Sequence, residues 1–538
     1  MAYAITRACC NDASCVSVCP VNCIHPTPDE PDFGRTDMLY VDPRTCIDCG
    51  ACADACPVDA IFPVDRLFGA DAEYARINAE HFGAEPGRNE WAAPRFPRSL
   101  PEAAPLRIAI VGTGPAACYT AQELLRSTSA EITLLDRLPL PGGLVRSGVA
   151  PDHQSTKRIG EGFSWLLRHP RVRLHLNVEV GRDLTHEKLA AHHHAVIYAV
   201  GAAADRRLGV EGEDLPGSTS ASSVVSWYNA HPDAAGFGLD LSAQRAVVIG
   251  NGNVALDVAR ILLSDPDRLA STDIADRALD ELRDSAVREV VLLGRRGPEH
   301  AACTAPELRA LRDLPGVEVA VEDDPRVRAA LSAAAPGGTA ALLAELPAAR
   351  IDWRAEPAPG RRVVFRFGAE PAALRGTDRV DSVEVRDPEG RTGTIAAGLV
   401  VRAIGYRSTP IPGLPFDAAS ATVPNESGRV LTEPGGPPLP GTYVVGWAKR
   451  GPSGGIGTNR GCAAETAGVL LDDAPSLAPP PAAGFDRWLR RRVPAAIGRR
   501  AVLAIDAAER RRGDRQGRPR VKFPSTPELL AAAKRFRR

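Results

Sequence analysis

The feature that most constrains this chain is a glycine-rich turn set between an apolar strand pattern and a helix pattern. The apolar stretch 108–111 runs into Gly112-Thr113-Gly114-Pro115-Ala116-Ala117, and a helix pattern follows at 118–125. Gly112 allows a sharp turn, Gly114 lets the backbone approach a pyrophosphate, and Ala117 lets helix and strand pack closely. A second strand pattern ends in Asp136, 24 residues after Gly112, where the ribose of a dinucleotide needs an acceptor. We therefore expect a dinucleotide site, for FAD, rather than a glycine turn in an ordinary α/β domain.

A second turn of the same kind lies further along the chain. Strand pattern 246–249 leads into Gly250-Asn251-Gly252-Asn253-Val254, and a helix pattern follows. The next strand pattern, 290–293, ends in Gly294-Arg295-Arg296 instead of an acid. Guanidinium groups attract a 2′-phosphate that a carboxylate would repel, so NADP is favoured over NAD; a solvent-facing arginine pair is the alternative. Two such turns predict an α/β fold with two Rossmann-like dinucleotide-binding domains.

Composition excludes several classes of protein. The chain has 538 residues, of which 44% are apolar and 24% charged, enough for three or four domains with full-sized cores. Its arginines are scattered and it has only five lysines, so no basic stripe indicates nucleic-acid binding. No run of about 18 apolar residues could cross a bilayer, and the N-terminus lacks the apolar core of a signal peptide. We expect a cytoplasmic monomer without membrane contact.

Nine of the twelve cysteines lie within the first 56 residues, and their spacing repeats. The second run is Cys46-x2-Cys49-x2-Cys52-x3-Cys56-Pro57, and the first run, Cys9-x2-Asp12-x2-Cys15-x3-Cys19-Pro20, copies it with one substitution. In this spacing three close thiolates hold one iron-sulfur cluster, while the cysteine before proline ligates the other. Crossing the runs gives one site from Cys19, Cys46, Cys49 and Cys52 and another from Cys9, Asp12, Cys15 and Cys56.

Asp12 makes the two sites unequal, because a carboxylate is a harder and weaker iron ligand than a thiolate. We expect one [4Fe-4S] cluster at the all-cysteine site. At the other we expect either a [3Fe-4S] cluster or a labile [4Fe-4S] cluster whose iron at Asp12 is replaceable. Zinc is the alternative, although zinc sites are usually built from two CxxC pairs. Cys10 and Cys23 are expected to pack beside the clusters, and Cys10 could compete with Cys9.

Charge is unevenly divided between the head, which we define as residues 1–66, and the remainder. The head holds ten acidic residues and four arginines, a net charge of −6, whereas the whole chain carries −1. The remainder is therefore basic. Opposite charges favour docking of the head on the body, most strongly at low salt; a solvated acidic surface without a docking role is the alternative.

The remaining patterns divide the chain after the head. Residues 67–105 are expected to be a linker, with a short helix over 67–82 followed by a proline-rich tether. Residues 106–204 form the first part of an FAD domain, 205–405 an inserted NADP domain, and 406–538 the second part of the FAD domain. In this last part a strand and loop over 441–459 lead into a helix whose N-terminus could stabilise charge on a reduced flavin.

Together these motifs resemble the adrenodoxin reductase-type ferredoxin-NADP reductases. The resemblance rests on residues 112–117, 142–153, 251–260, 295–298 and 447–459, with a recognisable tail at 504–509 and 517–522. The head resembles the bacterial-type two-cluster ferredoxins. The whole chain is thus similar to the actinobacterial fused ferredoxin/ferredoxin-NADP reductases. This resemblance implies a glutathione reductase-like pair of Rossmann domains preceded by a small α+β ferredoxin domain.

The resemblance also implies site residues. Those implied for FAD, with Gly112 and Gly114 of the turn, are Ala116, Asp136, Leu144, Val180, Trp447, Gly454, Gly455 and Ile456. Those implied for NADP are Arg206, Asn251, Gly252, Asn253, Val254, Arg295, Arg296, Glu307 and Gly454. Asp152 and His153 are implied to handle protons beside the flavin. The family often has a second acid shortly after the glutamate matched by Glu307, but Ala310 stands there, so a proton relay on that side lacks a member.

The implied reaction is hydride transfer from NADPH to FAD, followed by single-electron steps to the head, to ferredoxin or to other acceptors such as oxygenase systems. Pyridine nucleotide-disulfide reductases share this plan but need a vicinal thiol pair, and Cys118, Cys303 and Cys462 are single and widely separated. A non-catalytic electron-wiring subunit is the other alternative; such subunits have a different, helical cysteine domain.

Two kinds of short run are assigned no ligand. His192-His193-His194 leads into a strand pattern and is expected to be a turn rather than a metal site. The basic runs 510–512 and 534–538 are expected to be solvated ends without a nucleic-acid or protein partner.

Overall fold

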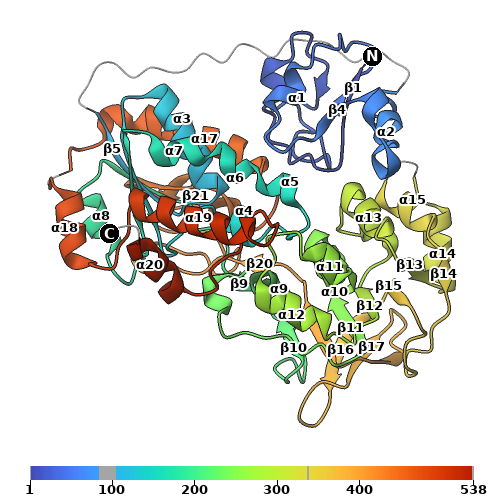
Figure 1. Ribbon diagram of the computed structural model, residues 1–538. Coiled ribbons are helices and arrows are strands. Elements are labelled where there is room, and N and C mark those ends of the chain that lie inside the picture. Colours follow the sequence, from blue (N-terminus) through green and yellow to red (C-terminus); the bar gives the residue numbers. More distant parts are fainter. Residues whose placement is uncertain (1, 84–104, 336–337, 481, 536–538) are drawn as a thin grey trace.

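The computed structural model describes residues 2–83, 105–335, 338–480 and 482–535. It contains a small head and two larger α/β units, and Figure 1 shows the head in blue above them. Each larger unit is built on a seven-stranded sheet with parallel strands at its centre. The predicted class, two Rossmann-like domains preceded by a small α+β domain, is therefore confirmed.

The head is built from two short antiparallel strand pairs. β1 (Tyr3–Ile5) pairs with β4 (Ile61–Pro63), and β2 (Ile24–His25) pairs with β3 (Tyr40–Val41). Three short 3-10 helices, η1 (Val16–Val18), η2 (Val64–Arg66) and η3 (Gly69–Asp71), and the helix α1 (Ala51–Ala55) complete it. Apolar side chains and cysteines from these elements share one core.

Helix α2 (Tyr74–His81) belongs to the head, although its sequence position suggested the linker. The buried Asn78 amide joins it to two strands: its Oδ1 accepts from the N–H of Ile5 (3.0 Å) and of Val41 (2.9 Å), and its Nδ2 donates to the Ile5 carbonyl (2.8 Å). Tyr74 is buried in the same core. The packed head thus extends through His81, beyond the expected boundary at residue 66, because one side chain ties the helix to distant strands. Most of the expected tether, residues 84–104, lies outside the described residues.

The first α/β unit has the strand order β21-β22-β23-β8-β5-β6-β7. The bounds are β5 (Arg107–Val111), β6 (Glu131–Asp136), β7 (Val172–Leu176), β8 (Ala195–Tyr198), β21 (Asn425–Glu426), β22 (Arg429–Leu431) and β23 (Pro438–Val444). β21 and β22 form an antiparallel edge, and the other five strands are parallel. Helices α3 (Pro115–Ser127) and α17 (Thr458–Asp473) pack together against this sheet. The central strands β5 and β8 are almost wholly buried, as expected where both faces of a parallel sheet are covered.

The second α/β unit has the strand order β10-β19-β11-β12-β15-β13-β14, with every pair parallel. The bounds are β10 (Ser218–Ser220), β11 (Arg245–Ile249), β12 (Glu289–Gly294), β13 (Val317–Glu322), β14 (Ala348–Ala349), β15 (Arg361–Phe367) and β19 (Leu399–Arg402). Helix α10 (Asn253–Leu263) follows β11. A three-stranded antiparallel sheet of β16 (Glu370–Arg375), β17 (Ser382–Arg386) and β18 (Thr392–Ala396) packs against the parallel one.

The second unit is inserted into the first through two short strands. β9 (Ala204–Asp205) carries the chain out of the first unit and β20 (Tyr406–Arg407) carries it back, and the two pair antiparallel. The chain ends with α18 (Phe485–Arg492), α19 (Arg499–Asp514) and α20 (Thr526–Arg535), in red beside the first sheet in Figure 1. The segment after α19, residues 517–522, turns back toward the boundary between the units.

Shorter helices connect these elements. They are α4 (Gly143–Ser147), α5 (Gln154–Lys157), α6 (Ile159–Gly162), α7 (Ser164–Arg168), α8 (His186–Ala190), α9 (Ala221–Tyr228), α11 (Pro266–Leu269), α12 (Asp276–Arg283), α13 (Ala305–Arg312), α14 (Pro325–Ser332), α15 (Thr339–Ala344) and α16 (Trp447–Arg450). Among the described residues, no helix is both long and apolar enough to cross a membrane.

Candidate functional site

The first glycine turn has the geometry that its sequence predicts. Gly112 has a φ of +113°, and a Cβ there would lie 2.3 Å from the carbonyl oxygen of Ala199. Only glycine fits this position, because both the dihedral angle and the approach to β8 exclude a side chain. At the end of β6, Asp136 accepts hydrogen bonds at one carboxylate oxygen from Thr113 N (2.9 Å) and Oγ1 (2.5 Å). Burial raises the pKa of Asp136, and these hydrogen bonds oppose that rise.

The second turn repeats this construction in the inserted unit. Gly250 has a φ of +122°, and a Cβ there would lie 2.4 Å from the carbonyl oxygen of Ala403. The side-chain oxygen of Asn253 accepts from the N–H of Thr304 at 2.8 Å, which ties the start of α10 to the loop before α13. Two equivalent strand, turn and helix units are therefore present, one in each sheet.

Both turns line one cleft of about 1950 Å³. The predicted residues that line it are Gly112, Gly114, Ala116, Asp136, Leu144, Asp152, His153, Val180, Asn251, Gly252, Asn253, Val254, Glu307, Trp447, Gly454, Gly455 and Ile456. Three other predicted residues, Arg206, Arg295 and Arg296, are exposed and are not among the lining residues. The cleft therefore brings together the residues expected for two different dinucleotides, while the arginines expected at the 2′-phosphate lie outside its lining.

An ionic cluster stands in the cleft between the two turns. The buried guanidinium of Arg260 contacts Asp152 (Nε to Oδ2, 2.5 Å), Asp257 (2.6 Å) and Glu307 (3.4 Å). His153 Nδ1 lies 3.7 Å from Glu307 Oε1. Burial alone would raise the pKa of Asp152, but the Arg260 charge outweighs it and lowers that pKa to about 2. For Asp257 burial prevails over Arg260 and raises the pKa to about 6.

Arg260 and Asp257 were quoted in the helix motif, but sequence reasoning assigned them no role. The available signal was the pair of charges, three residues apart, on an otherwise apolar helix directly after a glycine turn. Such charges are buried only when they are paired. Three ligand atoms of His153, Asp257 and Glu307 lie within 4.8 Å of one another, a spacing that could suit a metal ion. Arg260 already supplies a positive charge to both of these acids.

The head closes one side of the cleft. Cys9, Cys10 and Asn11 line it together with the glycine turns. The N–H of Gly457, just before α17, donates to the Cys10 carbonyl at 3.0 Å, and a Cβ on Gly457 would lie 1.9 Å from the Asn11 carbonyl oxygen. Arg460 donates to the Asp12 carbonyl at 2.7 Å. Sequence reasoning gave no role to Gly457 or Arg460, because their partners lie about 450 positions away.

Acidic groups of the head meet basic or N–H groups of the body at other points. Asp37 accepts from the N–H of Ala305, the first residue of α13, at 2.8 Å. Glu73 contacts Arg309 (3.2 Å) and Arg312 (3.4 Å) on the same helix. Asp59 forms an ion pair with Arg158 of the first unit. The acidic surface of the head is thus part of an interface with the body. Of the two interpretations of the charge distribution, docking of the head on the body is the one that the structure supports.

The charged neighbours of the head cysteines indicate which of them lie near one another. Burial raises the pKa of Cys15, and the nearby charges of Cys9, Asp12, Cys56 and Cys52 raise it further. Burial likewise raises the pKa of Cys52 to about 11, with further contributions from Cys46, Cys19 and Cys49. The assignment of these cysteines to two separate sites stays a prediction.

The two unassigned head cysteines lie near the groups. Cys23 is buried, with its sulfur 3.5 Å from that of Cys19. Cys10 lies near Asp12, Cys9 and Cys56, whose charges add to burial in raising its pKa. This neighbourhood is compatible with either expected role for Cys10, packing beside a cluster or competing as a ligand.

The remaining cysteines and the histidine run have packing roles. Cys118, Cys303 and Cys462 are buried and unbridged, and none of these three lines the cleft. His193 is held by Leu189 and Thr133, and His194 accepts from the N–H of Arg107. The run is therefore a structural turn, as predicted.

The basic runs near the C-terminus differ in what the structure describes. Arg510 pairs with Glu161 and Asp506, and Arg512 lies over the Phe523 ring, so this run is bound within the protein. Residues 536–538 of the last run lie outside the described residues.

Two protein families match parts of this chain. Residues 106–294 match the pyridine nucleotide-disulphide oxidoreductase family, and residues 39–62 match the 4Fe-4S binding domain family. The first match covers both glycine turns, and the second covers the cysteine run that begins at Cys46.

Similar proteins of known name extend these matches over the whole chain. A probable ferredoxin/ferredoxin-NADP reductase of Mycobacterium tuberculosis is 47% identical over 99% of this chain and 95% of its own length. A protein of the same name from Mycobacterium leprae is 46% identical over 99% of this chain and 98% of its own length. Among solved structures, Mycobacterium tuberculosis FprA in complex with NADPH is 42% identical, with a TM-score of 0.72, and the match covers 80% of this chain and 100% of that one. This chain therefore belongs to the family of fused ferredoxin/ferredoxin-NADP reductases.

Proposed function

We propose that this protein takes electrons from NADPH through FAD and passes them singly to the iron-sulfur clusters of its own head or to an external ferredoxin. The observation that carries the proposal is the single cleft lined by both glycine turns and by Cys9 and Cys10 of the head. The sites proposed for NADPH, for FAD and for the nearer iron-sulfur cluster therefore adjoin one another in this cleft. FAD, when bound, converts a two-electron hydride transfer into single-electron steps.

The first turn fits FAD. Helix α3 begins at Pro115, directly after the turn, so its free N–H groups and positive end are available to a pyrophosphate. Asp136 offers a carboxylate at the end of the next strand, and Thr458, where α17 begins, lines the same cleft. The residues assigned to FAD are Gly112, Gly114, Ala116, Asp136, Leu144, Val180, Trp447, Gly454, Gly455 and Ile456.

The second turn is assigned to NADP(H). Gly294 lies against Asn251, since a Cβ on Gly294 would come 2.8 Å from Asn251 Nδ2. Arg295 and Arg296 therefore leave β12 beside the turn, where guanidinium groups suit a 2′-phosphate. The assigned residues are Arg206, Asn251, Gly252, Asn253, Val254, Arg295, Arg296, Glu307 and Gly454. The name of the FprA structure, a complex with NADPH, supports this assignment.

Asp152 and His153 are assigned to proton handling. Arg260 keeps Asp152 ionised, with a pKa of about 2, so Asp152 supplies a fixed negative charge. His153 Nδ1 faces Glu307 Oε1 at 3.7 Å, so its imidazole is the general acid-base group of the proposed site.

In the head, Cys19, Cys46, Cys49 and Cys52 are assigned to a [4Fe-4S] cluster, and Cys9, Asp12, Cys15 and Cys56 to a second cluster, [3Fe-4S] or labile [4Fe-4S]. Cys9 lines the cleft, so the Asp12 site is the nearer one to the flavin. Cys49 is exposed and Ile47 is 59% exposed, so the other site faces outward. In this order, electrons pass from the flavin to the Asp12 site, then to the outward-facing site, and from there to external acceptors such as oxygenase systems. Because the head docks on its own body, a cytoplasmic monomer suffices for the proposed reaction.

The test is an anaerobic titration of the purified holoprotein with NADPH, followed by optical and EPR spectroscopy. We expect bound FAD, loss of its visible absorbance, and then the EPR signals of a reduced head. NADPH-dependent reduction of cytochrome c by the isolated chain is expected as well. A holoprotein that contains flavin but is not reduced by NADPH contradicts the proposal and supports the electron-wiring subunit.

A further inference from the structure

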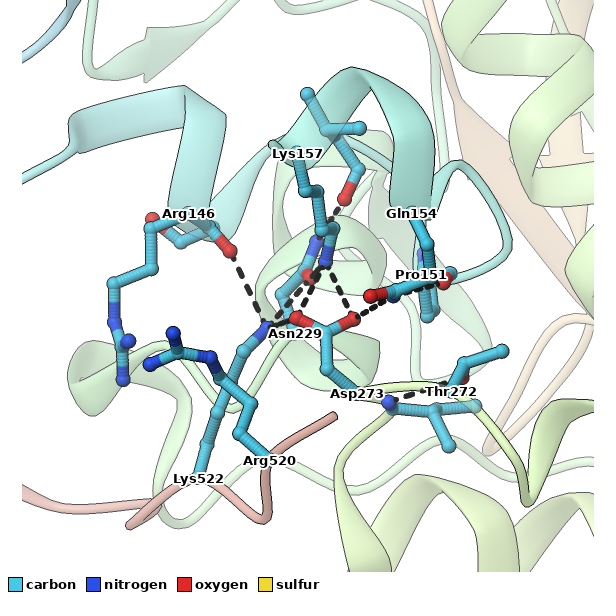
Figure 2. A network of polar contacts seen from close by, with 12 residues as sticks. Arg146, Pro151, Gln154, Lys157, Asn229, Thr272, Asp273, Arg520 and Lys522 are labelled. Atoms are coloured by element: carbon cyan, nitrogen blue, oxygen red, sulfur yellow. Dashed lines mark hydrogen bonds and ion pairs between the residues drawn. The ribbon is translucent and has the colours of Figure 1, made fainter. Parts of the chain in front are cut away.

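A buried polar network lies where three segments of the chain meet (Figure 2). Its centre is Asp273, 4% exposed, whose carboxylate contacts the ammonium groups of Lys157 (2.8 and 2.9 Å) and Lys522 (2.8 Å). The side-chain oxygen of Asn229 accepts from the same two lysines, at 2.8 Å from Lys157 and 3.1 Å from Lys522. Lys522 also donates to the Arg146 carbonyl at 3.3 Å, so all three of its N–H groups have acceptors.

The members of this network come from three parts of the fold. Arg146 and Lys157 belong to α4 and α5 of the first unit, and Asn229 and Asp273 belong to the inserted unit. Lys522 belongs to the segment after α19, which we call the tail, residues 517–522. The network therefore spans the boundary between the two dinucleotide-binding units.

The tail is fixed on both sides of that boundary. On the inserted unit, Arg518 donates to the carbonyls of Thr272 (2.9 Å) and Ile274 and contacts Asp276 (2.6 Å). On the first unit, the fully buried Glu509 of α19 contacts Arg146 at 2.7 Å and Arg520 at 3.2 Å. The tail therefore connects the two units through contacts with both of them.

The network also holds the loop that carries Asp152 and His153. Asn229 Nδ2 donates to the Val149 carbonyl at 3.0 Å. Gln154 Nε2 donates both to the Pro151 carbonyl (2.5 Å) and to Asp273 (2.8 Å). Both flanks of the two residues assigned to proton handling are therefore anchored to side chains that Lys522 contacts.

Two ammonium groups share one carboxylate and one amide oxygen here, so each member depends on the others. Removing one partner from a buried charged network leaves the remaining charges without compensation. Displacements of about 1 Å caused by a distant substitution can slow a reaction roughly a hundredfold. The side-chain partners of Lys522 are Asp273, Asn229 and the Arg146 carbonyl, and none of these residues lines the cleft. The loss of Lys522 would nevertheless act on the loop 149–153.

We propose that Lys522 and the tail are positioning elements for hydride transfer, which set the loop 149–153 and the inserted unit relative to each other through Asp273 and Asn229. This inference rests on the proposed function, because the loop matters through Asp152 and His153. It assigns a role to the tail motif 517–522, for which the sequence offered none.

The test compares holoprotein carrying Lys522→Met with Lys534→Met, the same substitution at an exposed position of the C-terminal region. We expect Lys522→Met to retain FAD but to slow flavin reduction by saturating NADPH, measured per bound flavin, about tenfold or more. Backbone hydrogen exchange should rise in residues 149–157 and 270–276. Lys534→Met should match the wild type in both measurements.

A second variant covers the case in which Lys522→Met fails to fold. Gln154→Ala removes two hydrogen bonds of a neutral side chain, to Asp273 and to the Pro151 carbonyl, and we expect a smaller change in the same direction in both readouts. A variant with lower thermal stability but wild-type flavin reduction per bound flavin and wild-type exchange in 149–157 would overturn the inference. If the wild type itself is not reduced by NADPH, the proposed function fails, whereas hydrogen exchange still reports whether Lys522 holds the loop.

Discussion

At the scale of single residues, the site contains buried charged side chains, each of which would destabilise the fold without its partners. Asp152, Asp257 and Glu307 surround one guanidinium, that of Arg260, whose side chain is only 3% exposed. Desolvated charges of this kind stabilise a fold only when every partner is present. Burial and the charge of Arg260 act in opposite directions on the pKa of each acid. The Arg260 charge prevails at Asp152 and lowers its pKa to about 2, whereas burial prevails at Asp257 and raises its pKa to about 6.

Arg260→Met should therefore destabilise the protein at neutral pH by about 3–5 kcal/mol, since buried carboxylates lose their cation. The lowered pKa of Asp152 means that its contribution is present above its ordinary pKa and is lost as the pH falls through about 2. Without Arg260, which lowers the pKa of Asp152 and of Asp257, these two carboxylates bind protons at higher pH, so the deficit in stability of the variant should shrink as the pH falls toward 4.

Chemical unfolding at pH 7 and at pH 4.5 measures this difference in free energy. Arg283→Met, at an exposed position of α12, is the matched control and should change stability by less than about 0.5 kcal/mol. A deficit that is equal at both pH values would argue against the ionic cluster.

Asp12→Cys tests the assignment of the first cluster. A thiolate in place of the carboxylate completes the ferredoxin pattern, so the variant should retain one iron more than the wild type after exposure to a chelator. Iron analysis together with EPR of the oxidised protein measures this. Equal iron content and equal spectra would show that Asp12 already holds a stable iron or that Cys10 takes its place.

At the scale of elements, the local patterns could be predicted from sequence and the long-range attachments could not. Gly112 and Gly250 stand out because a positive φ and a close backbone contact admit only glycine. Helix α2 was predicted near its true position but assigned to the linker, because the Asn78 contacts with Ile5 and Val41 carry no local signal.

Asn78→Ala should detach α2 from the head. The three hydrogen bonds to backbone groups of β1 and β3 are lost, together with one to Tyr74 within the helix, which we expect to cost about 2–4 kcal/mol. Loss of cluster absorbance during urea unfolding measures the stability of the head, while flavin fluorescence reports the body separately. Glu80→Ala, at an exposed position on the same helix, should leave both transitions in place. If both variants unfold alike, α2 does not stabilise the head.

The start of α17 should be equally sensitive, because it contacts the head. Gly457→Ala places a methyl group 1.9 Å from the Asn11 carbonyl and should displace the head, whereas Gly461→Ala on the same helix meets no atom within 4 Å. Reduction of ferricyanide by NADPH, which needs only the body, should remain near the wild-type rate in both variants. Cluster reduction should slow at least tenfold in Gly457→Ala alone. Equal cluster reduction in the two variants would show that this contact is not part of the electron path.

At the scale of the whole molecule, an acidic head docks on a basic body, and Cys9 and Cys10 of the head line the same cleft as both glycine turns. The opposite charges of the two parts were visible in the sequence, but the docking points, such as Arg460 with Asp12, were not. The same holds for the tail, whose residues are distinctive in sequence but whose partners Asn229 and Asp273 lie about 250 to 290 positions earlier. Arg206, Arg295 and Arg296 lie outside the lining of the cleft in this structure, so their assignment to NADP stays a prediction.

The central claim is that electrons pass from the cleft to the head within one molecule. Mixing the holoprotein anaerobically with one equivalent of NADPH, and following flavin absorbance with freeze-quenched EPR of the clusters, tests it most directly. Cluster reduction should follow flavin reduction at a rate that does not change over a tenfold range of protein concentration. A rate that rises in proportion to protein concentration, or clusters that stay oxidised after the flavin is reduced, would contradict the account.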